Sequence, residues 1–273
     1  MNAAPTGAEQ RLHEHLLEVA LEAAAEAVDL VHTNRPIELS VEAKSSATDH
    51  VTQMDRASES LIRSIIVRHR PDDRIVGEEE GDSGPGDSGV TWYVDPIDGT
   101  TNYVYDHPGY AVSIAAVVDG VGTVGVVADP THGRTYQAVR GGPASCDGRP
   151  LRLGPPPSVP AALVATGFSY DAQRRGRQGE VVARLLPRVR DIRRMGAAAV
   201  DLCSVAAGRV DAYFEAGLGA WDLAAGAVIA EAAGARLGAL DGGPVRPGSV
   251  LVAHPDLFDP LLDLLQELGA ADA

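Results

Sequence analysis

The sequence predicts a mixed α/β protein whose first half is rich in antiparallel strands and whose second half alternates strands with helices. Three features of the 273 residues support this prediction. Amphipathic helical patterns lie near the N-terminal end, β-branched runs joined by a tight turn follow, and strand and helix patterns alternate from about residue 158. The two halves cover about residues 9–153 and 158–268.

Two helices are predicted first. Apolar residues recur at steps of three and four over 12–31, which is the spacing of a helix with one buried face. A second stripe of this kind predicts a helix over 56–70, which ends before Pro71. Residues 1–8 are expected to be frayed, and the polar segment 44–50 is expected to be a loop.

Strands dominate the rest of the first half. The β-branched runs 110–118 and 122–128 are joined through Asp119-Gly120, which predicts a hairpin. Residues 81–88 are rich in Gly, Ser and Asp and are expected to form an exposed loop. Further strands are predicted at 74–76, 90–94, 134–139, 161–166, 189–194, 210–214 and 249–253, and further helices at 174–187, 197–208, 222–233 and 256–268.

Composition excludes several classes of function. The formal net charge of −15 argues against binding to nucleic acid or to an anionic membrane surface, because both need an excess of basic residues. No apolar run approaches the ~20 residues that span a bilayer, and no signal peptide is predicted. Cys146 and Cys203 cannot form a disulfide framework, so we expect a cytoplasmic protein with two reduced thiols.

Three acidic clusters stand out, each at a strand end or a helix start: Gly77–Glu80, Asp95-Pro-Ile-Asp98 and Trp221-Asp222. Burying several carboxylates together is costly without a counter-charge. A hard divalent cation such as Mg²⁺ supplies that charge, and it prefers oxygen ligands. A strand that ends in two acids has no obvious packing reason, so Asp95-Pro-Ile-Asp98 is the strongest of the three signals.

The four residues after Asp98 add a second kind of ligand site. Gly99 allows the backbone to approach a ligand closely, and a helical turn starting there would point the amides of Gly99, Thr100 and Thr101 outward as an anion site. One short segment could therefore hold both a metal and a phosphate. That combination suits phosphoryl transfer to water, which depends on positioning and on charge stabilisation.

Each candidate outside this segment also has a plain structural explanation. Asp55 could be the N-cap of the helix over 56–70, and Asp222 could be a first-turn acid favoured by the helix dipole. The Glu78–Glu80 run could be a solvated turn, Lys44 a surface lysine, and Glu215 a loop acid after an apolar strand.

Together the motifs resemble those of the inositol monophosphatase family of Mg²⁺-dependent, lithium-inhibited phosphatases, in particular bacterial, actinobacterial members of the inositol-1-monophosphatase type. The resemblance runs from about residue 12 to residue 268. It implies the sugar-phosphatase fold, an α-β-α-β-α sandwich forming a single domain over 1–273, and a homodimer. The matching segments are Lys44-Ser-Ser, Asp49–Asp55, Gly77-Glu-Glu79, Trp92–Asn102, Ala111–Ile114, Gly196–Ala199, Asp211–Glu215 and Trp221–Gly226.

The resemblance also implies a metal site with two to three Mg²⁺. A first ion would be held by Glu78, Asp95 and the carbonyl of Ile97, and a second by Asp95, Asp98 and Asp222. A third, weaker ion would lie near Glu78, with the Lys44–Asp49 loop closing over it.

The same resemblance assigns the reaction and its residues. Glu78 and Thr100 would activate a water for direct in-line attack, with Asp55 hydrogen-bonded to Thr100 and no covalent phosphoenzyme. The amides of Gly99 and Thr100 would bind phosphate. Further substrate contacts would come from Asp98, Gly196, Ala198 and Glu215.

The substrate implied is a small phosphate ester, with inositol monophosphate first because Gly99-Thr-Thr-Asn102 resembles the inositol-phosphatase branch. Ala197 departs from the threonine of animal members and removes a possible hydroxyl contact with the ring. Many bacterial members of the family are promiscuous, so the resemblance leaves fructose 1,6-bisphosphate, histidinol phosphate and nucleotide 3′-phosphates as alternatives. A haloacid-dehalogenase-type phosphatase is disfavoured because two residues, not one, separate Asp95 from Asp98. A regulatory binding protein on the same scaffold is a further alternative.

Overall fold

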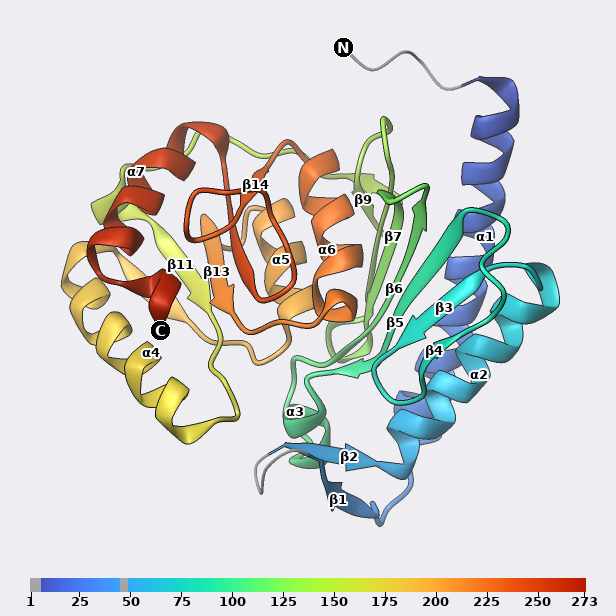
Figure 1. The fold of residues 1–273 in the computed structure, drawn as a ribbon. Helices are drawn as coiled ribbons and strands as arrows, with labels where there is room; N and C mark the ends of the chain where they lie inside the picture. The colour runs from blue at the N-terminus through green and yellow to red at the C-terminus, as the bar shows by residue number, and fades with distance from the viewer. Residues whose placement is uncertain (1–5, 45–48) are drawn as a thin grey trace.

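The structure is a computed structural model that describes residues 6–44 and 49–273. Helices and sheets stack in alternating layers (Figure 1). α1 (Gly7–Val28) and α2 (Gln53–His69) cover one face of a large sheet. α5 (Ala198–Ala206) and α6 (Ala220–Ala232) lie between that sheet and a smaller one, and α4 (Ala172–Leu185) and α7 (Pro255–Glu267) cover the far face of the smaller sheet. The predicted α-β-α-β-α layering is confirmed.

The large sheet has eight strands in the order β10-β9-β8-β7-β6-β5-β3-β4. All of its neighbouring pairs are antiparallel except β3 with β5. The predicted hairpin joins β6 to β7 through Asp119 and Gly120, whose φ angles of 50° and 78° fit a tight hairpin turn. The strands are β3 (Arg74–Gly77), β4 (Gly81–Ser83), β5 (Val90–Asp98), β6 (Ala111–Val118), β7 (Val121–Asp129), β8 (Arg134–Val139), β9 (Ser145–Cys146) and β10 (Arg149–Pro150).

The smaller sheet has five strands in the order β12-β11-β13-β15-β14. β11 is parallel to both of its neighbours, whereas β15 is antiparallel to both of its own. The strands are β11 (Leu163–Thr166), β12 (Asp191–Arg193), β13 (Ala212–Ala216), β14 (Arg236–Gly238) and β15 (Ser249–Ala253). Glu215 therefore lies within β13 and is not the loop acid of the plain explanation.

A β-bulge in β5 creates the local geometry of the Asp95-Pro-Ile-Asp98 segment. Asp95 pairs with Ser113 and Asp98 pairs with Ala111, so three steps along β5 match two steps along β6. The extra residue breaks the strict alternation of side chains, and it allows both carboxylates to face the same side. Pro96 is tolerated here because a bulge does not need its missing N–H.

The two N-terminal helices begin earlier than the sequence predicts, because their caps lie upstream of the apolar stripes. Thr6 caps α1 in a capping box with Glu9, so the expected fraying does not reach residues 6–8, and residues 1–5 lie outside the described chain. Thr52 caps α2 in a second capping box, in which Asp55 is the partner and not the N-cap. The interpretation of Asp55 as an N-cap is therefore wrong.

Some short strands have no counterpart in the prediction, because so few residues carry little periodicity. β1 (Val41–Ala43) and β2 (His50–Thr52) form a separate antiparallel pair at the edge of the predicted loop. β4 lies in the segment expected to be a loop, although its residues are exposed as expected. α3 (Thr100–Val104) is the helical turn expected after Gly99.

The core is built largely from small aliphatic side chains, as the low aromatic content of 4% requires. Close approach of α6 to the large sheet depends on Gly125, where a Cβ atom would lie 2.4 Å from the carbonyl oxygen of Ala225. Among the described residues, no helix is both long and apolar enough to cross a membrane.

Candidate active site

One cavity of about 420 Å³ collects residues from most of the predicted motifs. Asp55 and Lys44 do not line it directly, but they contact Thr100 and Glu78, which do. The predicted site residues that line the cavity are Asp49, Glu78, Asp95, Ile97, Asp98, Gly99, Thr100, Gly196, Ala198, Glu215 and Asp222.

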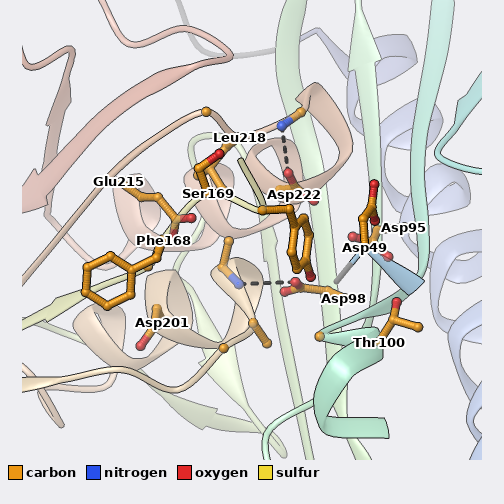
Figure 2. A pocket seen from close by; sticks show the side chains of 18 of the residues that line it. Asp49, Asp95, Asp98, Thr100, Phe168, Ser169, Asp201, Glu215, Leu218 and Asp222 are labelled. Carbon is orange, nitrogen blue, oxygen red and sulfur yellow. Dashed lines mark hydrogen bonds between the residues drawn. The ribbon is translucent and has the colours of Figure 1, made fainter. Parts of the chain in front are cut away.

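The carboxylates of Asp95, Asp98 and Asp222 form the centre of the site (Figure 2), with one oxygen atom from each within 4.8 Å of the others. Asp95 and Asp98 are 1% and 7% exposed. Burial raises the pKa of all three, and for Asp95 and Asp98 the charges of neighbouring acids raise it well above its ordinary value. A cluster of this kind binds protons or cations strongly.

Backbone amides from three segments hold these carboxylates in place. Asp98 accepts hydrogen bonds from the amides of Ala198 at 3.1 Å and Ala199 at 2.7 Å, at the start of α5. Asp222 accepts one from the amide of Gly219 at 2.6 Å, so it serves its helix as an N-terminal acid while also joining the cluster. Asp95 Oδ1 accepts from the amide of Ile97 at 3.1 Å.

Glu78 lies beside this cluster and is paired with Lys44. Lys44 Nζ donates to Glu78 Oε1 at 2.8 Å and also contacts Glu79. Burial raises the pKa of Glu78 to about 7 despite the opposing effect of Lys44. Burial alone would lower the pKa of Lys44, but Glu78 and Glu79 outweigh it and raise that pKa. Neither Glu78 nor Lys44 is therefore the freely solvated residue of the plain explanation.

Asp55 connects α2 to the turn after β5. Its Oδ1 accepts a hydrogen bond from Thr100 Oγ1 at 3.0 Å, and its Oδ2 accepts from the amide of Thr52 at 2.8 Å. The Thr100 hydroxyl also lies 3.1 Å from the carbonyl oxygen of Ile97, but a carboxylate is the stronger acceptor for its single proton. The lone pairs of Thr100 Oγ1 are thereby left available to accept a hydrogen bond from a ligand.

The opposite side of the cavity is formed around Glu215 (Figure 2). Tyr213 donates its hydroxyl proton to Glu215 Oε2 at 2.6 Å, and burial raises the pKa of Glu215 to about 7. Gly167 makes room for this carboxylate, since a Cβ atom there would lie 1.9 Å from Oε2. The cavity thus has a strongly acidic end and an end with hydrogen-bonding groups suited to hydroxyls.

Two further residues at the site were not assigned a role from the sequence. Asn102 Nδ2 donates to the carbonyls of Gly109 and Met195, both at 2.7 Å, and so ties the turn after β5 to the loop before α5. Asp201 lines the cavity at 1% exposure, and its Oδ1 has no hydrogen-bond partner within the described chain. Its signal in the sequence is a single acid inside an otherwise apolar helix.

The chain is similar to known proteins over most of its length. The chain matches the inositol monophosphatase family over residues 12–270. It is 46% identical over 241 residues to an inositol-1-monophosphatase of Mycobacterium leprae, covering 84% of this chain and 82% of that protein. It is 36% identical over 261 residues to Nus factor SuhB of Escherichia coli, covering 94% and 98%. The crystal structure of extragenic suppressor protein suhB from Bartonella henselae matches with a TM-score of 0.87 at 31% identity, covering 92% of this chain and 98% of that one.

Proposed function

Because the chain belongs to the inositol monophosphatase family, we propose that it is a Mg²⁺-dependent phosphomonoesterase that acts on inositol monophosphate. The observation that carries this proposal is the convergence of Asp95, Asp98 and Asp222 in one cavity. The family match also disfavours the haloacid-dehalogenase alternative.

The residues present fit Mg²⁺. Every candidate ligand offers oxygen, which hard divalent cations prefer, and the buried carboxylates need a counter-charge. Two to three ions would supply the positive charge that activates water and stabilises the leaving alkoxide. The proposed ligands are Glu78, Asp95, the carbonyl of Ile97, Asp98 and Asp222, with a third, weaker site between Glu78 and the segment from Lys44 to Asp49, of which residues 45–48 lie outside the described chain.

The protein's own groups can orient and deprotonate the attacking water. The Thr100 hydroxyl donates its hydrogen bond to Asp55, so its oxygen is free to accept a hydrogen bond from water. Glu78 is the proposed group that takes the proton from this water. Asp55 thus acts through Thr100, by fixing the direction in which its hydroxyl donates.

Substrate would lie across the cavity, with its phosphate at the acidic end and its hydroxyls toward Glu215. The amides of Gly99 and Thr100 are the proposed phosphate donors. Asp98, Gly196, Ala198 and Glu215 are the proposed contacts of the polyol, and all four line the cavity. Ala198 also has a second role, because its amide donates a hydrogen bond to Asp98.

Glu215→Ala is expected to raise KM for inositol 1-phosphate more than KM for a small non-inositol ester such as phenyl phosphate. The reason is that Glu215 lines the cavity and would accept hydrogen bonds from ring hydroxyls that the small ester lacks. Steady-state kinetics on both substrates measure the difference. Equal changes would mean that Glu215 does not read the substrate, and Tyr213→Phe serves as a control that keeps the carboxylate.

Mg²⁺ is expected to raise the thermal midpoint Tm more at pH 8 than at pH 6. Folding raises the pKa of Glu78 from 4.5 to about 7, and it also raises the pKa of Asp95 and Asp98. The metal-free protein therefore loses stability as pH rises from 4.5 through about 7, because the folded state then gives up the protons that these carboxylates hold. Bound cations would restore the lost stability by taking the place of those protons. Differential scanning fluorimetry with NaCl of matched ionic strength as control tests this. An equal rise at both pH values would contradict it.

Phosphate release from a panel of esters tests the proposed function. The panel contains inositol 1-phosphate, glycerol 2-phosphate, fructose 1,6-bisphosphate, histidinol phosphate and 3′-phosphoadenosine 5′-phosphate, with Mg²⁺, without it, and with added lithium. Lithium-sensitive, Mg²⁺-dependent release led by inositol 1-phosphate is the expected result. A different leading substrate would retain the reaction and change the substrate, whereas no release from any ester would refute the proposal and favour a regulatory role.

A further inference from the structure

Glu59 is a fully buried acid that the proposed chemistry does not use. It lies on α2 with 0% exposure, and each of its hydrogen-bond partners within the described chain is a donor. Its Oε2 accepts the amide of Glu79 at 2.7 Å, and its Oε1 accepts the amide of Glu80 at 2.9 Å. Arg63, one helical turn later, donates Nε to Oε1 at 2.8 Å and supplies the counter-charge.

These contacts fix the turn that carries Glu78. On the N-terminal side of the turn, the amide of Glu78 donates to the carbonyl of Val94 at 3.2 Å, which continues the pairing of β3 with β5. On the C-terminal side, the next two amides are held by Glu59. Gly77 leaves the space for this, because a Cβ atom there would lie 2.1 Å from Glu59 Oε1. The backbone is therefore held on both sides of Glu78.

The same face of α2 supports the rest of the acidic end. Asp55, Ser58 and Glu59 are spaced at i, i+3 and i+4, so they project from one side of the helix. Asp55 accepts from Thr100, and Ser58 Oγ donates to the carbonyl of Pro96 at 3.2 Å, within the bulge between Asp95 and Asp98. One helix face thus contacts the three segments that carry Glu78, the two aspartates of β5, and Thr100.

We propose that Glu59 is a positioning residue, which holds the turn of Glu78 in register with the carboxylates of β5. Glu78 can then share divalent cations with the cluster of Asp95, Asp98 and Asp222. The inference rests on the proposed function, because it assigns a purpose to the placement of Glu78. Glu59 lies outside the cavity and controls cation affinity while touching neither substrate nor cation.

Glu59→Gln is the sharpest test. The amide side chain keeps the size of the carboxylate but turns an NH₂ group toward a donor, since the amides of Glu79 and Glu80 and the Arg63 guanidinium all donate. We expect Mn²⁺ binding, followed by its electron paramagnetic resonance signal, to weaken by about 10- to 100-fold. The Mg²⁺ concentration for half-maximal activity should rise by the same factor, with kcat recovering toward wild type at saturating Mg²⁺.

Ile62→Val is the matched control. Ile62 lies on the same helix at 0% exposure, so its truncation disturbs the core around α2 but leaves the hydrogen bonds of Glu59 to the Glu78 turn in place. This variant should lose thermal stability but keep the cation affinity of the wild type. Cation binding by Glu59→Gln equal to that of Ile62→Val would overturn the inference.

Glu59→Asp decides the matter if the glutamine variant does not fold. It keeps the negative charge beside Arg63 but shortens the reach toward the two amides. Weaker Mn²⁺ binding supports the inference, and unchanged binding overturns it. A wild type that neither binds Mn²⁺ nor hydrolyses any ester would instead refute the proposed function and this inference with it, whereas an active wild type separates the two.

Discussion

Replacing Asp95 by asparagine is expected to lower the turnover by about 10³-fold or more while the fold survives. Asp95 is the most buried member of the acidic cluster and is the proposed ligand shared by two cations. The change removes a full negative charge from the centre of the site but keeps the size of the side chain. Steady-state kinetics at saturating Mg²⁺ measure the loss.

The stability of the Asp95→Asn variant gives an independent readout. The charges of Glu78, Asp98 and Asp222 all raise the pKa of Asp95, so these groups repel one another in the metal-free protein. Removing one charge should leave Tm without Mg²⁺ unchanged or higher and should reduce the rise in Tm on adding Mg²⁺. Near-normal turnover at saturating Mg²⁺ would refute the role of Asp95.

Asp73→Asn is the control for this substitution. Asp73 is also buried, at 2% exposure, but it accepts hydrogen bonds from Trp92 Nε1 at 2.8 Å and from Arg70, away from the cavity. The control should therefore lose stability while keeping its turnover per folded molecule. Asp95→Asn should thus lose turnover but not stability, and Asp73→Asn should lose stability but not turnover. This difference separates an acid of the site from a structural one.

The layers of the fold could be predicted because long elements leave a periodic pattern in the sequence. The stripes of α1 and α2 and the β6–β7 hairpin each contain enough residues to show it. The pair β1–β2 and the edge strand β14 could not be found, since three residues carry no period and their pairing depends on distant partners.

The site could be predicted as a set of residues but not as a geometry. The motif shows two acids in Asp95-Pro-Ile-Asp98, whereas only the register with β6 shows the bulge that lets both face one side. Asp55 and Asp222 illustrate a second limit. Sequence reasoning treats helix capping and a place in the site as alternatives, but in each case one carboxylate does both.

Supporting residues were missed because they lie inside helices whose pattern is otherwise ordinary. Glu59 follows Ser58 in a helix with a clear apolar stripe. Its partners are the amides of Glu79 and Glu80, about twenty residues later, and no pattern near Glu59 in the sequence predicts them. The charged neighbours of Asp201 include Glu215 and Asp98, which belong to two other segments of the chain. Buried acids of this kind become visible only when the chain is folded.

Gly99→Ala is expected to lower activity by about 10²-fold and stability by roughly 1–3 kcal/mol. Gly99 adopts φ 89°, a left-handed conformation that side chains disfavour. A Cβ atom would lie 2.9 Å from the carbonyl oxygen of Gly109 and 3.0 Å from that of Gly196. Relief of these contacts requires the turn to move, and the turn links Asp98 to Thr100.

The matched control is Gly148→Ala, which separates backbone strain from displacement of the site. Gly148 has a similar φ of 74°, but a Cβ atom there would meet nothing within 4 Å. This variant should lose stability through strain alone and keep its activity per folded molecule. Unfolding by urea and kinetics corrected for the folded fraction measure both effects. Equal specific activity of the two alanine variants would show that close packing around Gly99 is not needed for catalysis, and that the turn tolerates movement between Asp98, a proposed metal ligand, and Thr100, a proposed phosphate donor.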